Sequence, residues 1–207
     1  MRKIFIFLLL IIICVSISFP EIQVGIISGI SLMSDNKYKG GFAYGGILEV
    51  GIMKYLSLEG YFSFQNFGVS PDQNSLSKGE ANRTSFLLAI KGRYPVLNNK
   101  LYPFVSIGFG YALNKFELDS NILNEWANIG FNVKEEIKNS SILNISFGAD
   151  YFVLSHFSIG AKFVYSSSSP DGSWSQSDIY SNENVGGNFS KLNFNSIGLL
   201  LSLRYVF

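Results

Sequence analysis

The chain ends with Ser196-Ile197-Gly198-Leu199-Leu200-Leu201-Ser202-Leu203-Arg204-Tyr205-Val206-Phe207, in which two kinds of residue alternate. Large apolar side chains stand at every odd position of this stretch, whereas most even positions carry small or polar side chains. Successive side chains of a β-strand point to opposite faces of the sheet. The pattern therefore predicts a strand with one large apolar face and one narrower, more polar face.

Seven further segments alternate in the same way, although the first two are weaker because Gly and Ile occur on both of their faces. We place the eight segments at 22–33, 41–51, 55–66, 83–94, 101–113, 141–152, 157–167 and 192–207. Their more polar faces carry mainly Ser, Gly and Ala, which suit the narrow interior of an eight-stranded barrel. Their large apolar faces suit contact with lipid. A soluble lipocalin-like barrel would reverse this arrangement, and we hold it as the alternative.

The connections between these segments differ in length. Short connections at 52–54, 95–100 and 153–156 separate longer ones at 67–82, 114–140 and 168–191, and the first connection covers 34–40. Outer-membrane barrels alternate short periplasmic turns with longer extracellular loops, and an even number of strands returns the chain to its starting side. The sequence thus predicts an all-β, eight-stranded antiparallel up-and-down transmembrane β-barrel over residues 19–207.

The composition agrees with a membrane barrel. Charged residues make up 15% of the chain and aromatic residues another 15%, whereas an average soluble domain is about 25% charged. After residue 18, no apolar run reaches the ~20 residues that a membrane helix needs. The net charge is +1 and no basic stretch stands out, so we expect no nucleic-acid partner.

Residues 1–18 have the pattern of a secretory signal peptide. Arg2 and Lys3 precede an unbroken apolar run over 4–15, and small residues follow at Ser16 and Ser18. This order predicts cleavage after residue 18 and export through an envelope of the Gram-negative type. An uncleaved anchor helix is the alternative, but the apolar run is short for one.

The only cysteine, Cys14, lies inside this leader, so the mature chain would hold no disulfide. A lipoprotein acylation site needs a small residue before its cysteine. Ile13 occupies that position, which argues against acylation.

The C-terminal stretch and one internal segment resemble a known family. Leu203, Tyr205 and the terminal Phe207 resemble the signal that the barrel-assembly machinery recognises. Together with Pro103-Phe104-Val105-Ser106-Ile107-Gly108-Phe109-Gly110-Tyr111, they are similar to the eight-stranded outer-membrane barrels of the OmpA and OmpX type. The resemblance covers the whole mature chain and implies a fold and a location in the cell outer membrane, but no particular activity. The strand pattern runs to Phe207, so we expect no C-terminal peptidoglycan-binding domain and carry over no function of longer OmpA proteins that depends on one.

Charged residues also occur on the face that we assign to the barrel interior. Unpaired charges in a narrow, poorly hydrated lumen would cost several kcal/mol each, so these residues should pair with one another. We expect a salt-bridge plug that rigidifies the barrel, and hold a weakly conducting polar path as the alternative. The predicted network consists of Glu49, Glu59, Lys91, Arg93, Asp150, Lys162 and Arg204.

Catalysis has little support in the sequence. The single histidine, His156, precedes Ser158 in a His-x-Ser pattern that resembles part of the catalytic set of outer-membrane lipid A deacylases. However, His156 falls in a short turn on the periplasmic side, and the position where an acid would be needed holds Pro170. We find no metal-ligand cluster and no phosphate-binding loop, so we predict no catalytic residues, no metal and no cofactor.

The two longest loops are the predicted binding regions. In 114–140, apolar residues at 122, 126, 129, 133 and 137 fit one face of a helix capped by Asp119, Ser120 or Asn121, although Gly130 makes an extended hairpin nearly as plausible. The loop 168–191 is rich in Ser, Asn and Gly and reads as mobile and solvated. The candidate loop contacts are Trp126, Trp174 and Tyr180.

These observations favour a non-enzymatic outer-membrane protein with a structural or surface-interaction role, adhesion included, carried by its extracellular loops. A narrow porin-like pore for small solutes or hydrophobic molecules is the second hypothesis, and a lipid A-modifying enzyme is a weaker third. The expected partners are outer-membrane lipid, lipopolysaccharide and the barrel-assembly machinery. The extracellular ligand is not identified by the sequence, and we expect a monomer.

Overall fold

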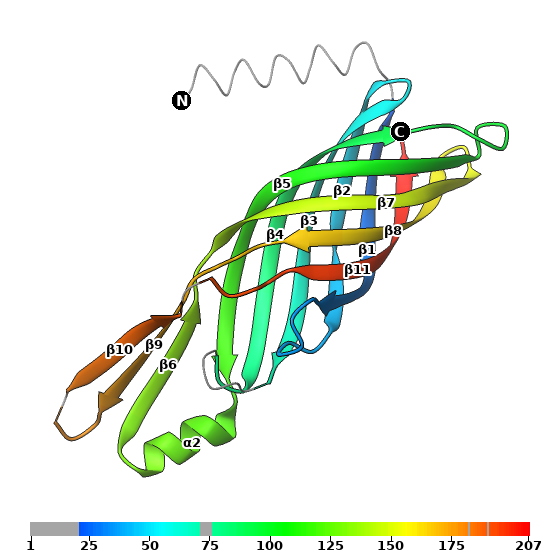
Figure 1. The fold of residues 1–207 in the computed structure, drawn as a ribbon. Coiled ribbons are helices and arrows are strands. Elements are labelled where there is room, and N and C mark those ends of the chain that lie inside the picture. The colour runs from blue at the N-terminus through cyan, green and yellow to red at the C-terminus, as the bar shows by residue number, and fades with distance from the viewer. Residues whose placement is uncertain (1–20, 71–75, 182, 190) are drawn as a thin grey trace.

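The computed structural model describes residues 21–70, 76–181, 183–189 and 191–207, and the predicted signal peptide over 1–18 lies outside them. Eight antiparallel strands close into a barrel, because the last strand pairs with the first (Figure 1). In spatial order they are β1 (Ile22–Met33), β11 (Ser196–Val206), β8 (Phe157–Ser167), β7 (Ser140–Leu154), β5 (Leu101–Leu118), β4 (Gly79–Arg93), β3 (Leu56–Val69) and β2 (Gly41–Met53). The predicted fold class is therefore confirmed. No helix in the described part of the chain is long and apolar enough to cross a membrane.

Several strand limits differ from the sequence prediction. β4 begins at Gly79 rather than at 83, β5 continues to Leu118 rather than ending at 113, and β11 begins at Ser196 rather than at 192. In β4 and β5 the outward-facing residues change from apolar to polar before the strands end. The hydrogen-bonded ladder nevertheless continues, so an apolar face marks the membrane-embedded part of a strand and not its full length.

The wall formed by β3, β4 and β5 has a polar outer face at the end that we predict to be extracellular, which is called the extracellular end below. Asn66 on β3 donates to the side chain of Asn82 at 2.9 Å and to that of Glu80 at 3.2 Å. On β5, Lys115 and Glu117 form an exposed ion pair. Polar groups of this kind belong in water, so these three strands extend beyond the part of the barrel whose outer surface is apolar.

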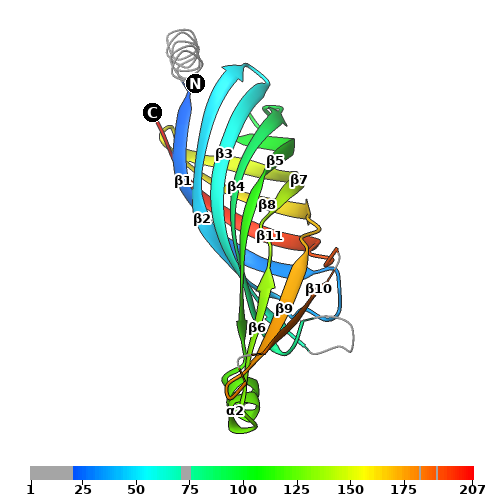
Figure 2. The same ribbon diagram turned by 90° about the vertical axis from the view of Figure 1, so that its left-hand side faces the viewer.

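The remaining elements form a unit at the extracellular end, opposite the C-terminus and the start of β1 (Figures 1 and 2). It consists of α2 (Ser120–Asn128), β6 (Phe131–Ile137), β9 (Gly172–Asp178) and β10 (Asn184–Phe189). The three strands form a separate sheet in the order β10-β9-β6, which we call the outer sheet. Neighbouring strands within the outer sheet are antiparallel.

The helix prediction for 114–140 is correct for its first half only. Asp119 caps α2 by accepting a hydrogen bond from the backbone N–H of Asn121. The helix ends before Gly130, which has a φ of +88° that favours glycine. The later apolar positions Val133 and Ile137 lie in β6.

The prediction of a mobile, solvated loop over 168–191 is wrong for most of its length. Residues 172–178 and 184–189 form a β-hairpin, and the first of these strands also pairs with β6. The Ser, Asn and Gly residues of this segment have low intrinsic strand preference. Pairing with β6, a strand distant in sequence, supplies backbone hydrogen bonds that no local pattern reveals.

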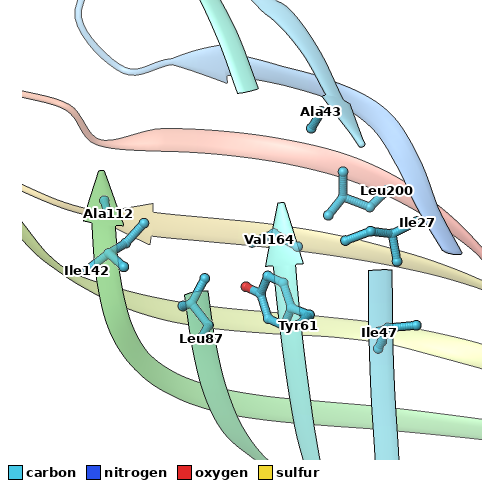
Figure 3. Packing of buried hydrophobic residues seen from close by; sticks show 9 residues of the cluster. All are labelled: Ile27, Ala43, Ile47, Tyr61, Leu87, Ala112, Ile142, Val164 and Leu200. Atoms are coloured by element: carbon cyan, nitrogen blue, oxygen red, sulfur yellow. The ribbon is translucent and has the colours of Figure 1, made fainter. Parts of the chain in front are cut away.

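Apolar side chains fill two layers inside the protein. One layer lies in the barrel, where each of the eight strands contributes at least one buried residue (Figure 3). A second layer closes the extracellular end. The first layer consists of Ile27, Ala43, Ile47, Tyr61, Leu87, Ala112, Ile142, Val164 and Leu200. The second consists of Tyr38, Phe67, Val69, Leu76, Ala81, Phe116, Ile137, Leu192 and Phe194.

The outside of the barrel is apolar where it would meet lipid. Large side chains such as Phe42, Val105 and Leu201 are 73%, 65% and 61% exposed. A water-soluble barrel could not leave a continuous belt of this kind unburied. The inside-out distribution is that of a transmembrane barrel, and the lipocalin-like alternative is excluded.

Closure of the barrel depends on the seam between β1 and β11. Gly29 lies opposite Leu200, and a Cβ at this position would overlap the carbonyl oxygen of Leu199. Substituting Gly29 by Val should therefore prevent closure. We expect the unboiled wild-type chain to migrate differently from the boiled chain on a detergent gel, and Gly29→Val to lose that folded band.

The matched control is Ser28→Val, which adds a larger side chain at the neighbouring, outward-facing position. It should keep the folded band. Equal mobility of boiled and unboiled wild-type chain would contradict a closed barrel.

Candidate functional site

Six charged side chains meet inside the barrel, on the periplasmic side of its apolar layer. Lys91 lies at the centre: its Nζ is 2.7 Å from Glu49 Oε2 and 2.5 Å from Asp150 Oδ2. Glu59 Oε2 is 3.8 Å from the same nitrogen. All four side chains are at most 2% exposed, so these ion pairs are shielded from water.

Two further cations complete this group, which we call the charge cluster. Arg204 Nη1 is 2.6 Å from Glu49 Oε2 and 3.2 Å from Asp150 Oδ2. Lys162 Nζ is 2.8 Å from Glu59 Oε1. The cluster thus pairs the three carboxylates of Glu49, Glu59 and Asp150 with the three cations of Lys91, Lys162 and Arg204.

The barrel topology brings these residues together from six strands. Glu49 and Glu59 lie directly opposite each other on β2 and β3, where two like charges alone would destabilise the pairing. Lys162 reaches Glu59 from β8, which is not a neighbour of β3 in the sheet. The cluster therefore spans the lumen from wall to wall, because its ion pairs connect strands that are not hydrogen-bonded neighbours in the barrel.

Aromatic rings lie beside the two lysines of the cluster. Lys91 Nζ is 4.1 Å from the ring centre of Phe104, and Lys162 Nζ is 4.3 Å from that of Tyr61. A cation over an aromatic face is attracted by the ring quadrupole, more strongly when water is excluded. These contacts fix both ammonium groups and occupy space next to them.

Arg93, the seventh predicted residue, lies at the periplasmic end of the lumen. Its Nη1 is 3.0 Å from Glu21 Oε1 and 3.6 Å from Glu49 Oε1. Glu21 was not among the predicted residues because it precedes the first strand, where no alternation indicates its direction. Arg93 thus joins the charge cluster to the start of β1.

Arg83 is a buried charge that the sequence analysis missed. It is 1% exposed and donates to Gln65 Oε1 at 2.8 Å, to Ser196 Oγ at 2.8 Å and to the carbonyl oxygen of Phe194 at 2.9 Å. Arg83 shares the odd-numbered face of β4 with Lys91 and Arg93, so the alternation could have found it. It was overlooked because it stands at the predicted start of that strand.

The order of side chains along β4 gives the order of layers in the lumen. Arg93 lies nearest the periplasm, followed by Lys91 of the charge cluster and Leu87 of the apolar layer. Arg83 and then Ala81 of the second apolar cluster follow toward the extracellular end. Charged and apolar layers therefore alternate along the barrel axis.

His156 and Ser158 do not form a catalytic pair in this arrangement. His156 is exposed, and its Nδ1 is 3.1 Å from the backbone oxygen of Val206. Ser158 is fully buried opposite Arg204. Among the described residues, no group of three or more His, Cys, Asp or Glu side chains could hold a metal ion.

The outer sheet is tied to the barrel and to α2 by specific hydrogen bonds. Glu135 on β6 accepts from the backbone N–H of Ser77 at 2.8 Å and from its hydroxyl at 2.6 Å. The backbone N–H of Ile179 donates to the carbonyl oxygen of Gly130, which links the β9–β10 turn to the end of α2.

Asp178 orders the turn between β9 and β10. The backbone N–H groups of Tyr180 and Ser181 donate to its carboxylate, which holds the pKa of Asp178 below its usual value. The turn is therefore defined by its own hydrogen bonds as well as by its link to α2.

The three predicted loop contacts differ in exposure. Tyr180 is 87% exposed at the turn between β9 and β10. Trp126 is half-buried and meets Phe131 edge to face, with ring centres 6.1 Å apart. Trp174 is half-buried on β9, and its indole lies over Gly187 of β10. Only Tyr180 presents most of its surface to the outside.

The predicted assembly signal faces outward at the periplasmic end of β11. Leu203, Tyr205 and Phe207 are 49%, 40% and 67% exposed. The Tyr205 ring is 4.9 Å from that of Phe207 and 5.2 Å from that of Phe157. The recognition of these residues during assembly stays a prediction.

Removing one member of the charge cluster should be more harmful than removing an ion pair at the surface. Lys91→Met would leave Glu49 and Asp150 with excess negative charge, at a cost of about 3–5 kcal/mol in unfolding free energy. Adding Asp150→Asn restores the charge balance and should recover part of that loss. Urea titration of the chain in lipid vesicles, followed by the folded band on unboiled gels, measures both effects.

Lys115→Met is the control, because Lys115 is 73% exposed in its ion pair and its loss should cost under ~1 kcal/mol. If Lys91→Met and Lys115→Met had equal effects, the cluster would not contribute to stability.

Comparison with known proteins places this barrel among outer-membrane proteins. The family model described as "Outer membrane protein beta-barrel domain" matches residues 6–205. No protein in the curated set matches the sequence.

Solved structures share the fold at low sequence identity. The outer membrane protein OprG from Pseudomonas aeruginosa is 14% identical with a TM-score of 0.65, covering 90% of this chain and 94% of OprG. A major outer membrane protein from Thermus thermophilus is 11% identical with a TM-score of 0.57, covering 90% and 99%. Neisserial surface protein A is 11% identical with a TM-score of 0.55, covering 90% and 96%. These likenesses concern the fold, which fits the bacterial outer membrane. On the match to its family model, the chain belongs to the outer membrane protein β-barrel domain family.

Proposed function

We propose that the protein is a closed, non-enzymatic scaffold of the outer membrane that holds the outer sheet and α2 outside the cell for contact with other molecules. The observation that carries the proposal is the filled lumen. The charge cluster crosses the barrel from wall to wall, and two apolar layers lie beyond it. An eight-stranded barrel is only wide enough for its own side chains, so these layers leave little space for a solute.

The outer sheet and α2 offer the surface for such contacts. Exposed apolar side chains occur on α2 and just after it, in the turn between β9 and β10, and at the start of β10. Exposed aromatic and aliphatic groups on a rigid support are common anchors of protein interfaces. The group consists of Leu123, Ile129, Ile179, Tyr180 and Val185.

Catalysis is not part of the proposal. A general base must lie within hydrogen-bond reach of the group that it activates. His156 is turned to the backbone oxygen of Val206, and Ser158 lies inside the wall. The proposed partners at the membrane are lipid, lipopolysaccharide and, through the C-terminal residues of β11, the barrel-assembly machinery.

The filled lumen predicts that the refolded mature chain is electrically silent in a planar lipid bilayer. Folding is verified first by gel mobility, and a large porin in the same bilayer serves as the positive control. Stable, discrete openings that change on Lys162→Ala or Arg204→Ala would contradict the proposal. That result would favour a narrow pore instead.

The exposed turn predicts a loss of surface adhesion when its apolar groups are removed. Because interface aromatics commonly contribute ~2 kcal/mol, Ile179→Ser with Tyr180→Ser should lower adhesion of expressing bacteria to a serum-protein coat roughly thirtyfold. The matched control is Tyr94→Ser with Leu97→Ser, which removes two exposed apolar groups at the opposite, periplasmic end. Adhesion that is the same with both pairs, or no greater than that of cells lacking the protein, would contradict an adhesive role.

A further inference from the structure

β10 is an edge strand of the outer sheet. Among the described residues, the sheet order β10-β9-β6 gives it one neighbour, β9, and its other side faces outward (Figures 1 and 2). Four of its six residues are exposed, and Gly187 and Phe189 are half-buried. An uncovered strand edge presents unpaired backbone N–H and C=O groups, which can pair with another extended chain.

The register shows which backbone groups are unpaired. The backbone N–H of Asp178 donates to the carbonyl oxygen of Glu183 at 3.0 Å, at the end where β9 and β10 meet. In an antiparallel pair, hydrogen-bonded and non-hydrogen-bonded positions alternate along the strand. Counting from Glu183, the backbone groups of 185, 187 and 189 face β9. Those of Asn184, Gly186 and Asn188 point away from the sheet.

The sequence of β10 lacks the features that normally protect an edge. Asn184–Phe189 contains no Lys, no Pro and no other charge, and its pairing with β9 has no bulge. Natural edge strands usually carry at least one of these features, because each of them discourages further pairing. The opposite edge strand, β6, carries three charged residues in seven positions, Lys134, Glu135 and Glu136. Of the two edges of the outer sheet, β10 therefore lacks the charges that protect β6.

We propose that β10 pairs antiparallel with β10 of a second copy of this protein. A twofold symmetric pair requires one residue to lie opposite itself. With Gly186 opposite Gly186, Asn184 lies opposite Asn188 at both ends. Every outward N–H and C=O of the strand then has a partner, because each of these opposed pairs exchanges both hydrogen bonds.

The side chains suit this register. No like charges face each other, and Val185 of one copy lies opposite Gly187 of the other, beside the Trp174 indole that covers this glycine. Glu183 precedes the strand and Lys191 follows it, both exposed. In an antiparallel pair, Glu183 of one copy comes to the same end as Lys191 of the other. Opposite charges that come to the same end of the strand pair attract each other.

The direction of β10 determines where the second copy lies. The strands of the outer sheet run away from the rim of the barrel (Figures 1 and 2). Antiparallel pairing therefore points the two barrels in opposite directions, so that they sit in two facing membranes. The protein stays a monomer within each membrane. This inference rests on the proposed function and names the partner of the outer sheet: the same sheet on a neighbouring envelope.

The test uses lipid vesicles that carry the refolded full chain, with two populations labelled in different colours. Clustering is measured by fluorescence cross-correlation. We compare the wild type with Asn184→Lys/Asn188→Lys and with Asn184→Glu/Asn188→Glu. Because position 184 faces position 188 of the other copy, each variant alone brings like charges together and should cluster roughly tenfold less. Mixing the Lys vesicles with the Glu vesicles should restore clustering.

Restoration on mixing also shows that both variants are folded. The matched control is Asn124→Lys/Asn128→Lys, which adds the same charge on α2, away from the edge, and should cluster as the wild type does. The inference is overturned if wild-type vesicles do not cluster, if the Lys and Glu variants cluster as well as the wild type, or if mixing does not restore clustering. If it is overturned while Ile179→Ser/Tyr180→Ser still lowers adhesion, the proposed function stands with a different partner.

Discussion

The need to pair every backbone N–H and C=O group inside hydrocarbon governs this structure. A strand in lipid has no water to bond with, so an open sheet edge would leave polar groups unsatisfied at several kcal/mol each. The pairing of β1 with β11 removes the edges of the barrel and thereby meets that need. Outside the membrane the same need is relaxed. The outer sheet is consequently left open at β10, where water can solvate the free groups.

Closure with eight strands also decides what the interior can contain. The lumen is too narrow for much water, so each inward side chain must be small, apolar or paired. The charge cluster meets this condition because its three carboxylates face three cations. Replacing buried ion pairs by apolar residues is often neutral for stability, so their presence is not explained by stability alone. In this barrel the pairs join strands such as β3 and β8, which are not neighbours in the sheet. They therefore restrain the cross-section as well as filling it.

The sequence was most informative where one local rule operates without interruption. Alternation predicted the eight barrel strands. Within each strand it also predicted which side chains face the interior, and Lys91 and Arg204 are buried there in the structure. Alternation failed where a strand leaves the membrane, because its outward face becomes polar while its pairing continues. Arg83 was overlooked at such a boundary. Glu21 precedes any pattern, and the partnership of β6 with β9 depends on pairing between distant segments. Neither follows from local sequence.

The extended wall of β3, β4 and β5 has a mechanical consequence. The outer sheet joins the barrel partly through β5, which runs from the periplasmic end of the wall to the start of α2. A pull on the outer sheet would act along β5, whereas the hydrogen bonds to β4 and β7 lie across it. Such a load is shared among many bonds in shear and does not open them one after another. The attachment of the outer sheet to the barrel through β5 should therefore resist a steady pull far better than a loop at the end of a short hairpin would.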